Sequence, residues 1–247
     1  MPKMVIAPRI KSFICLNAHP LGCAANVERE IAVATKDAPG AGLKHALVIG
    51  ASTGYGLSSL VSTVFGYGAR GTAICLERPP QGERTASAGY YNLAAAQSAA
   101  RARGKEIVVI NGDAFSDEVK QEAVAHVAAS GVKLDCVVYS LAAPKRTDPQ
   151  SGVSWNSALK PIGTTFRSPS INLSNDKIQQ VEIEPASDAE IEATRKVMGG
   201  EDFVAWVTSA LLTLTQAAPP MRSRSAADSA AVCVSRSSLA LPIVPDR

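Results

Sequence analysis

The chain has 247 residues and a net charge of +3, with 46% hydrophobic and 19% charged residues. This composition excludes wholesale disorder and allows a sizeable core in one domain or two small ones. No dense block of Lys and Arg occurs, which argues against a nucleic-acid partner. No window reaches the roughly 20 uncharged apolar residues of a membrane helix, so we expect no membrane insertion.

The five cysteines indicate neither a disulfide scaffold nor a zinc site. Their number is odd, no pair has C-x-x-C spacing, and no H-E-x-x-H motif occurs. The first nine residues carry charges and prolines where a secretory signal needs an unbroken apolar stretch. We therefore expect a cytoplasmic protein with reduced thiols and no bound metal.

Short apolar runs alternate with Ala-rich helical patterns over the first 140 residues. The runs are at residues 46–49, 72–76, 107–110 and 136–139. The helical patterns are at residues 24–35, 57–65, 87–101 and 116–128. Because the runs are apolar on both faces, they are typical of buried parallel strands. The alternation predicts βαβ units and an α/β fold with a Rossmann-type, doubly wound, mostly parallel sheet.

The pattern changes after residue 150. Residues 151–185 mix isolated large apolar side chains with Ser, Thr, Asn and Pro, which predicts a hairpin-like excursion. Two helices are predicted next, at residues 187–198 and from Glu201 to about residue 214. Residues 216–247 are rich in Ala, Ser, Pro and Arg, and a closing strand or helix is hard to place there.

The strongest local signal is the glycine-rich loop at residues 48–57. Gly50, Gly54 and Gly56 form a G-x-x-x-G-x-G pattern between the first predicted strand and its helix. Such glycines permit a tight turn, backbone approach to a pyrophosphate and close packing of the helix on the sheet. The helix N-terminus then offers free N–H groups to the phosphates. No Gly-Lys-[Ser/Thr] follows, so a P-loop is excluded, and a glycine-rich turn without a ligand is the alternative.

Glu77 lies about twenty residues beyond this loop, at the end of the second predicted strand. A carboxylate there can accept both ribose hydroxyls of adenosine and repels a 2′-phosphate, which favours NAD over NADP. The alternative is a solvated acid, and the neighbouring Arg78 weakens the discrimination between the two nucleotides. The order of strand, loop, helix, strand and acid predicts dinucleotide binding.

Two further strand ends carry candidate residues. Asp113 follows the third predicted strand, where its carboxylate can reach an adenine edge. The alternative is an Asp that caps a helix N-terminus or stabilises a turn. Small residues at 140–143 follow the fourth strand and allow backbone to approach the nicotinamide side of a cofactor. The alternative there is an ordinary loop that starts with a small residue.

Six segments resemble one known family, the long-form trans-2-enoyl-CoA and enoyl-acyl-carrier-protein reductases of bacteria. These are NADH-dependent members of the short-chain dehydrogenase superfamily. The matching segments are residues 9–15 together with 17–20, and residues 48–56, 110–118, 138–142, 158–163 and 196–202. They follow one another in unbroken order between about residues 5 and 207.

The resemblance implies reduction of the C2=C3 double bond of an enoyl thioester, carried by CoA or acyl carrier protein, with hydride from NADH. It also implies a set of residues that contact NADH. These are Gly50, Ala51, Ser52, Thr53, Gly54, Tyr55, Leu76, Glu77, Asp113, Ala114, Leu141 and Ala142. The family usually has an aromatic side chain at the position of Leu76, so a stacking partner for adenine is missing here.

The family's proton donor is a Tyr with a Lys nine positions later, a Tyr-x8-Lys motif that this chain lacks. The phenol would polarise the thioester carbonyl, and the lysine would hold the nicotinamide ribose. Nine positions after the five tyrosines stand Val64, Leu76, Ala99, Ala100 and Asp148. The Tyr-x3-Lys spacing of ordinary short-chain dehydrogenases is absent too. We therefore assign no catalytic residue.

The match to the family stops abruptly within the last predicted helix. We expect a Rossmann-type domain over residues 1–215, incomplete at its C-terminal side, whose glycine-rich NADH-binding half is 1–80 and whose remainder is 81–215. Our hypothesis for 216–247 is an aberrant, disordered tail that is read in a shifted frame; a genuine short paralogue is the alternative. The rival function is a non-catalytic NAD-binding or interaction module derived from the family.

Overall fold

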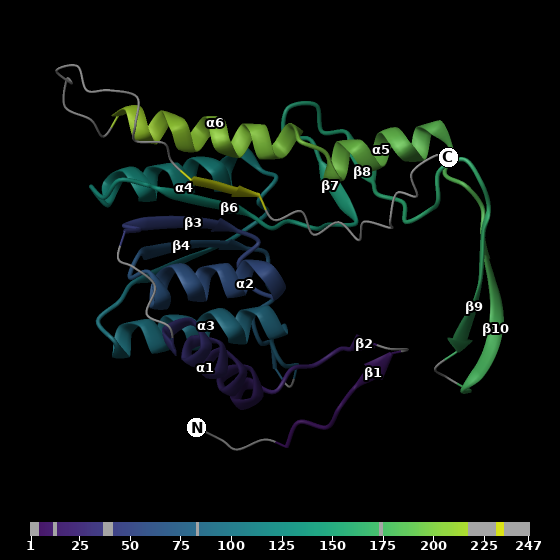
Figure 1. Cartoon of the computed structure of the whole chain (residues 1–247), viewed down its shortest axis with the longest axis horizontal. Helices are drawn as coiled ribbons and strands as arrows, with labels where there is room; N and C mark the ends of the chain where they lie inside the picture. The colour runs from purple at the N-terminus through teal and green to yellow at the C-terminus, as the bar shows by residue number, and fades with distance from the viewer. Residues whose placement is uncertain are drawn as a thin grey trace.

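A parallel sheet lies between two layers of helices (Figure 1). The computed structural model describes residues 5–11, 14–36, 42–82, 84–172, 175–216 and 231–234. The sheet consists of β3 (His45–Ile49), β4 (Arg70–Cys75), β5 (Ile107–Asn111), β6 (Cys136–Tyr139) and β11 (Ala231–Val234). Its strand order is β11-β6-β3-β4-β5, and every neighbouring pair is parallel. The predicted doubly wound α/β fold is confirmed.

Helices cover both faces of this sheet (Figure 1). On one face lie α1 (Pro20–Lys36), α2 (Gly54–Val61) and α3 (Ala88–Ala102), and on the other lie α4 (Asp117–Ala129) and α6 (Glu201–Gln216). Val48 belongs to the buried cluster under the first group, and its neighbour Ile49 belongs to the cluster under the second. Successive strand residues point to opposite faces, so a strand covered on both sides must be apolar throughout.

The helix and strand ends differ from the prediction by a few residues. α1 begins at Pro20 because proline suits the first helical position and the Nδ1 atom of His19 accepts a hydrogen bond from the Gly22 N–H at 3.3 Å. α2 begins at Gly54 and continues into one π-helical segment, η1 (Ser62–Gly66). β4 ends at Cys75, so Leu76 lies just beyond the sheet.

Smaller antiparallel units lie outside the central sheet. Near the N-terminus, β1 (Ile10–Lys11) pairs with β2 (Ile14–Cys15). The region 151–185 contributes β8 (Ser154–Asn156), which pairs with β7 (Lys145–Thr147), and the hairpin of β9 (Phe166–Asn172) and β10 (Lys177–Ile183). The hairpin projects away from the layered core (Figure 1). Next comes α5 (Asp188–Met198), which begins with a capping box between Ser187 and Glu190.

The expectation that the tail contains no regular element is wrong for four residues. Ala231–Val234 form β11, which pairs in parallel with β6 along the edge of the sheet. These residues are uncharged and apolar, and two are Val, which suits a strand. The rest of 216–247, apart from Gln216 at the end of α6, lies outside the described residues.

The strand order places a topological switch point beside β3. The chain moves from β3 to β4 and β5 in one direction, then returns to add β6 on the opposite side of β3. The connections that leave the carboxyl ends of β3 and β6 therefore diverge. In doubly wound sheets, ligands bind in this place.

The buried face of α1 allows a direct test of the packing between helix and sheet. Val27 is 0% exposed in the first core cluster, whereas Val33 on the same helix is 71% exposed. We expect Val27→Ala to lower the free energy of unfolding by about 2 kcal/mol, through lost apolar burial and a residual cavity. Val33→Ala should change it by less than about 0.5 kcal/mol. Urea denaturation measures both values, and equal losses would contradict the described packing of α1.

Candidate functional site

The glycine-rich loop lies at the switch point, pressed against the end of β6. Gly50 has a φ of +81°, and a Cβ there would collide with the carbonyl oxygen of Ser140. The N–H groups of Gly50 and Ala51 both donate to the carbonyl of Ile74 at 3.0 Å, which holds the turn onto β4. Only glycine fits this backbone conformation and this close approach to the Ser140 carbonyl.

The other two glycines have separate roles at the start of α2. A Cβ on Gly56 would collide with the carbonyl oxygen of Gly50, so this glycine lets the helix pack directly on the loop. Gly54 has a φ of +54°, and a Cβ there would meet nothing within 4 Å, so its outer side is open. Thr53 is the N-cap residue, with extended backbone. The first-turn N–H groups of α2 therefore face the open side of the loop with the positive end of the helix dipole.

The Glu77 carboxylate lies next to this loop. A Cβ on Gly89, in the first turn of α3, would collide with the Glu77 carboxylate and would lie 2.7 Å from the Cβ of Ser52. The absence of a side chain at Gly89 thus lets the acid and the loop approach each other. Asn92 of α3 donates from Nδ2 to the carbonyl of Ser52 at 3.0 Å, which holds the loop from the same helix.

The backbone of Glu77 is fixed by Asn111, at the end of β5. The Glu77 N–H donates to Asn111 Oδ1 at 2.7 Å, and Asn111 Nδ2 donates to the Glu77 carbonyl at 2.8 Å. Sequence reasoning missed Asn111, Gly89 and Asn92 as supporting residues. Only Asn111 gave a signal, as a polar residue that ends an apolar strand.

Burial raises the pKa of one side chain near the Glu77 carboxylate. Desolvation raises the pKa of the buried Cys75 thiol to about 12, and the charge of Glu77 adds to the rise. Cys75 is therefore a protonated, packed side chain beside the site rather than a nucleophile. Leu76 follows β4 directly, and Tyr55 lies in the first turn of α2. Their side chains are 72% and 69% exposed to solvent.

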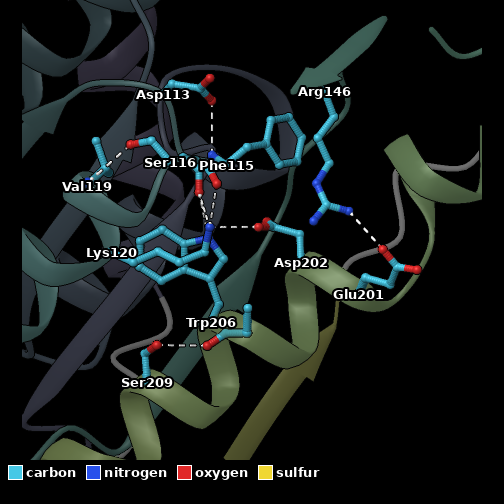
Figure 2. A network of polar contacts seen from close by, with 12 residues as sticks. Asp113, Phe115, Ser116, Val119, Lys120, Arg146, Glu201, Asp202, Trp206 and Ser209 are labelled. Carbon is cyan, nitrogen blue, oxygen red and sulfur yellow. Dashed lines mark hydrogen bonds and ion pairs between the residues drawn. The ribbon is translucent and has the colours of Figure 1, made fainter. Parts of the chain in front are cut away.

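Asp113 forms the turn that leads into α4. Its Oδ1 accepts a hydrogen bond from the Phe115 N–H at 3.0 Å (Figure 2). Its carbonyl accepts one from the Ser116 N–H at 3.0 Å. Ser116 then caps α4 by accepting from the Val119 N–H at 3.2 Å. The turn reading of Asp113 is thus correct. The residue is nonetheless exposed, so the same side chain can also face a ligand, while Ala114 beside it is buried.

Leu141 and Ala142 follow β6 on the opposite side of the loop. The Ser140 N–H donates to the carbonyl of Ile49 at 2.8 Å, which extends the β3–β6 pairing by one residue. A Cβ on Gly50 would lie 3.3 Å from the Leu141 side chain, so Leu141 adjoins the first loop glycine. Ala142 is exposed beside it. The predicted residues thus lie along one edge of the sheet, on the ends of β3, β4, β5 and β6.

Tyr139, at the end of β6, points into the second helix layer instead. Its hydroxyl donates to Asp202 Oδ2 at 2.8 Å. Burial, and then the Asp202 charge and hydrogen bond, raise the pKa of this phenol above its usual value. A phenol held in this way does not release its proton readily.

In the part of the chain that the structure describes, three or more His, Cys, Asp or Glu side chains nowhere gather closely enough to hold a metal ion. Nor does that part contain a helix with the length and hydropathy needed to cross a bilayer.

Comparison with known proteins identifies relatives over most of the chain. Residues 5–82 match the NAD(P)H binding domain of trans-2-enoyl-CoA reductase, and residues 84–218 match the trans-2-enoyl-CoA reductase catalytic region. The enoyl-[acyl-carrier-protein] reductase [NADH] of Idiomarina loihiensis is 48% identical over 205 residues, which are 83% of this chain and 52% of that protein. The trans-2-enoyl-CoA reductase [NADH] of Clostridium perfringens is 44% identical over 204 residues, again 83% of this chain and 52% of that protein.

Solved structures agree with this result. The trans-2-enoyl-CoA reductase of Treponema denticola, crystallised with NAD, superposes with a TM-score of 0.80 at 40% identity, over 85% of this chain and 54% of that one. This chain spans about half the length of the relatives that it matches. The glycine loop and the elements around it, from β3 to α6, lie within the matched residues. The chain belongs to the trans-2-enoyl-CoA reductase family.

Proposed function

We propose that this chain forms the NADH site of an enzyme that reduces the C2=C3 double bond of trans-2-enoyl thioesters. The observation that carries the proposal is the open, glycine-lined loop at the switch point with the Glu77 carboxylate beside it. The named relatives, and the Treponema denticola structure with NAD, support the same choice of cofactor. Relatives named for acyl-carrier-protein and for CoA substrates both occur, so the proposed substrate class is the enoyl thioester. A cytoplasmic location is part of this proposal.

The residues present fit an NADH molecule laid across the edge of the sheet. The N–H groups at the start of α2 and the open side of Gly54 suit the pyrophosphate. Glu77 suits the adenosine ribose, and the exposed Asp113 suits the adenine beyond it. Leu141 and the exposed Ala142, across the loop, would contact the nicotinamide end.

When bound, NADH would supply the hydride that adds to C3 of the enoyl thioester. The chain's own contribution is to bind and orient the two halves of the cofactor on either side of the loop. The 247 residues contain no tyrosine followed by Lys at the fourth or ninth position, and the Tyr139 proton is held by Asp202. We therefore propose that this chain by itself binds NADH without turnover.

Gly54 tests the pyrophosphate site. Gly54→Ala should weaken NADH binding by at least about tenfold, the effect of losing roughly 1.4 kcal/mol, because its methyl group would occupy the open side of the loop. Gly131→Ala is the matched control, since Gly131 has a φ of +64°, equally open surroundings and a place beyond the far end of α4. Fluorescence titration with NADH measures both affinities. Equal affinities of the two variants would contradict the site.

Glu77 tests the ribose contact and the choice of nucleotide. Glu77→Gln should lower NADH affinity by about tenfold or more, because hydrogen bonds to a charged group contribute roughly 1.5–3 kcal/mol. NADPH binding should not fall, since the repulsion of its 2′-phosphate is removed. Glu122→Gln, at an exposed position on α4, is the control. A parallel loss for NADH and NADPH would mean that Glu77 does not contact the ribose.

Turnover is tested with crotonyl-CoA. We expect no oxidation of NADH by this chain above background at 340 nm, under conditions in which the Treponema denticola enzyme is active. Measurable turnover would show that a residue we have not assigned donates the proton. NADH binding is measured on the same preparation, so that an inactive but folded protein is recognised.

A further inference from the structure

A buried ion pair lies beneath the turn that carries Asp113 (Figure 2). Lys120 of α4 donates from Nζ to the carbonyl of Phe115 at 2.8 Å and to the carbonyl of Ala114 at 3.1 Å. The same Nζ lies 2.8 Å from Oδ1 of Asp202, in the first turn of α6. The Lys120 and Asp202 side chains are only 7% and 2% exposed.

Two aromatic side chains complete this network. Trp206, one turn along α6 from Asp202, donates from Nε1 to the carbonyl of Ala114 at 3.0 Å. Its ring also lies beside the ammonium group, with Nζ 5.6 Å from the ring centroid. Tyr139 donates its hydroxyl hydrogen to the second carboxylate oxygen of Asp202 at 2.8 Å. The carbonyls of Ala114 and Phe115 are therefore both held by hydrogen bonds from side chains of α4 and α6.

A buried ion pair needs an explanation other than overall stability. Removing two charges from water is costly, and an apolar pair of similar volume usually stabilises a core equally well. What an apolar pair cannot do is hold two peptide carbonyls in one orientation. Here the carbonyls of Ala114 and Phe115 turn inward to Lys120, and Figure 2 shows the Asp113 carboxylate on the other side of the turn. The orientation of these two peptides thus sets where Asp113 points.

We infer that Lys120 and Asp202 are positioning residues for the adenine end of the dinucleotide site. This inference rests on the proposed function. It gives α6 an indirect part in cofactor binding, through the turn at residues 113–115. This helix lies outside the half of the chain that contains the glycine loop. Loss of the Lys120 charge removes the hydrogen bonds that its ammonium donates to the two carbonyls, and loss of the Asp202 charge leaves the buried ammonium without its counter-ion. In either case the turn no longer presents Asp113 and Ala114 in one fixed arrangement.

Three ligands separate this positioning role from a purely structural one. ADP spans the adenine and ribose end, reduced nicotinamide mononucleotide spans the other end, and NADH spans both. Asp202→Asn keeps the shape and the acceptor for Tyr139 but removes the charge that faces Lys120. We expect it to weaken NADH and ADP binding by the same factor, roughly 2- to 30-fold, which is the range for substitutions that act indirectly. Binding of reduced nicotinamide mononucleotide, followed by saturation-transfer NMR, should change by less than about twofold.

Two further variants keep the test decisive. Trp206→Phe removes the Nε1 donor to Ala114 and shortens a buried ring system while it keeps the charged pair, so it should shift ADP binding in the same direction by a smaller factor even if Asp202→Asn folds poorly. Lys160→Met breaks an exposed ion pair with Glu190 outside the network and should change none of the three affinities. A loss shared equally by all three ligands, or no loss for ADP in either network variant, would overturn the inference. If the unmodified chain binds neither NADH nor ADP, the proposed function fails as well.

Discussion

The close approach of two backbone segments at the carboxyl ends of β3 and β6 underlies the rest of the site. Gly50 turns out of β3 with a positive φ, directly against the carbonyl of Ser140, the residue whose N–H ends the β3–β6 pairing. A side chain at residue 50 would push these strand ends apart or force a different turn. The start of α2 then packs directly on Gly50, because Gly56 lies against the Gly50 carbonyl. One missing side chain thus sets the turn, the start of the helix and the direction of its free N–H groups.

The position of the Glu77 carboxylate depends on neighbours from two other elements. Asn111 holds the Glu77 backbone from β5, and α3 contributes Gly89 beneath its side chain. Asn92 of the same helix holds the loop at Ser52. The acid and the glycine loop are therefore fixed relative to each other by a shared support, α3. This support explains how a carboxylate on a loop can have the defined place that the proposed contact with a ribose requires.

The two faces of the sheet contribute differently. The layer of α1, α2 and α3 builds the loop and the acid, mainly through apolar packing and glycine contacts. The layer of α4 and α6 contains the buried polar network, which ends on the turn after β5. The ends of β3, β4 and β5 are thus supported from one helix layer or the other, and the end of β6 is held by β3. This arrangement agrees with a site built on rigid elements rather than on free loops.

The sequence by itself determined the fold class, the glycine loop and the strand-end acid. Alternation of short apolar runs with helical patterns, and glycines at fixed spacing, are local signals, and local signals are readable without coordinates. Family resemblance added the remaining candidate contacts. Tertiary structure alone decided that β3 and β6 are neighbours, that Gly89 leaves room for Glu77, and that Asp113 serves its own turn while it remains exposed. It also decided that Lys120 and Asp202, 82 positions apart in the chain, form one buried pair. Such contacts join residues far apart in the chain, and they arise only when the layers close on one another, so no spacing or composition could indicate them.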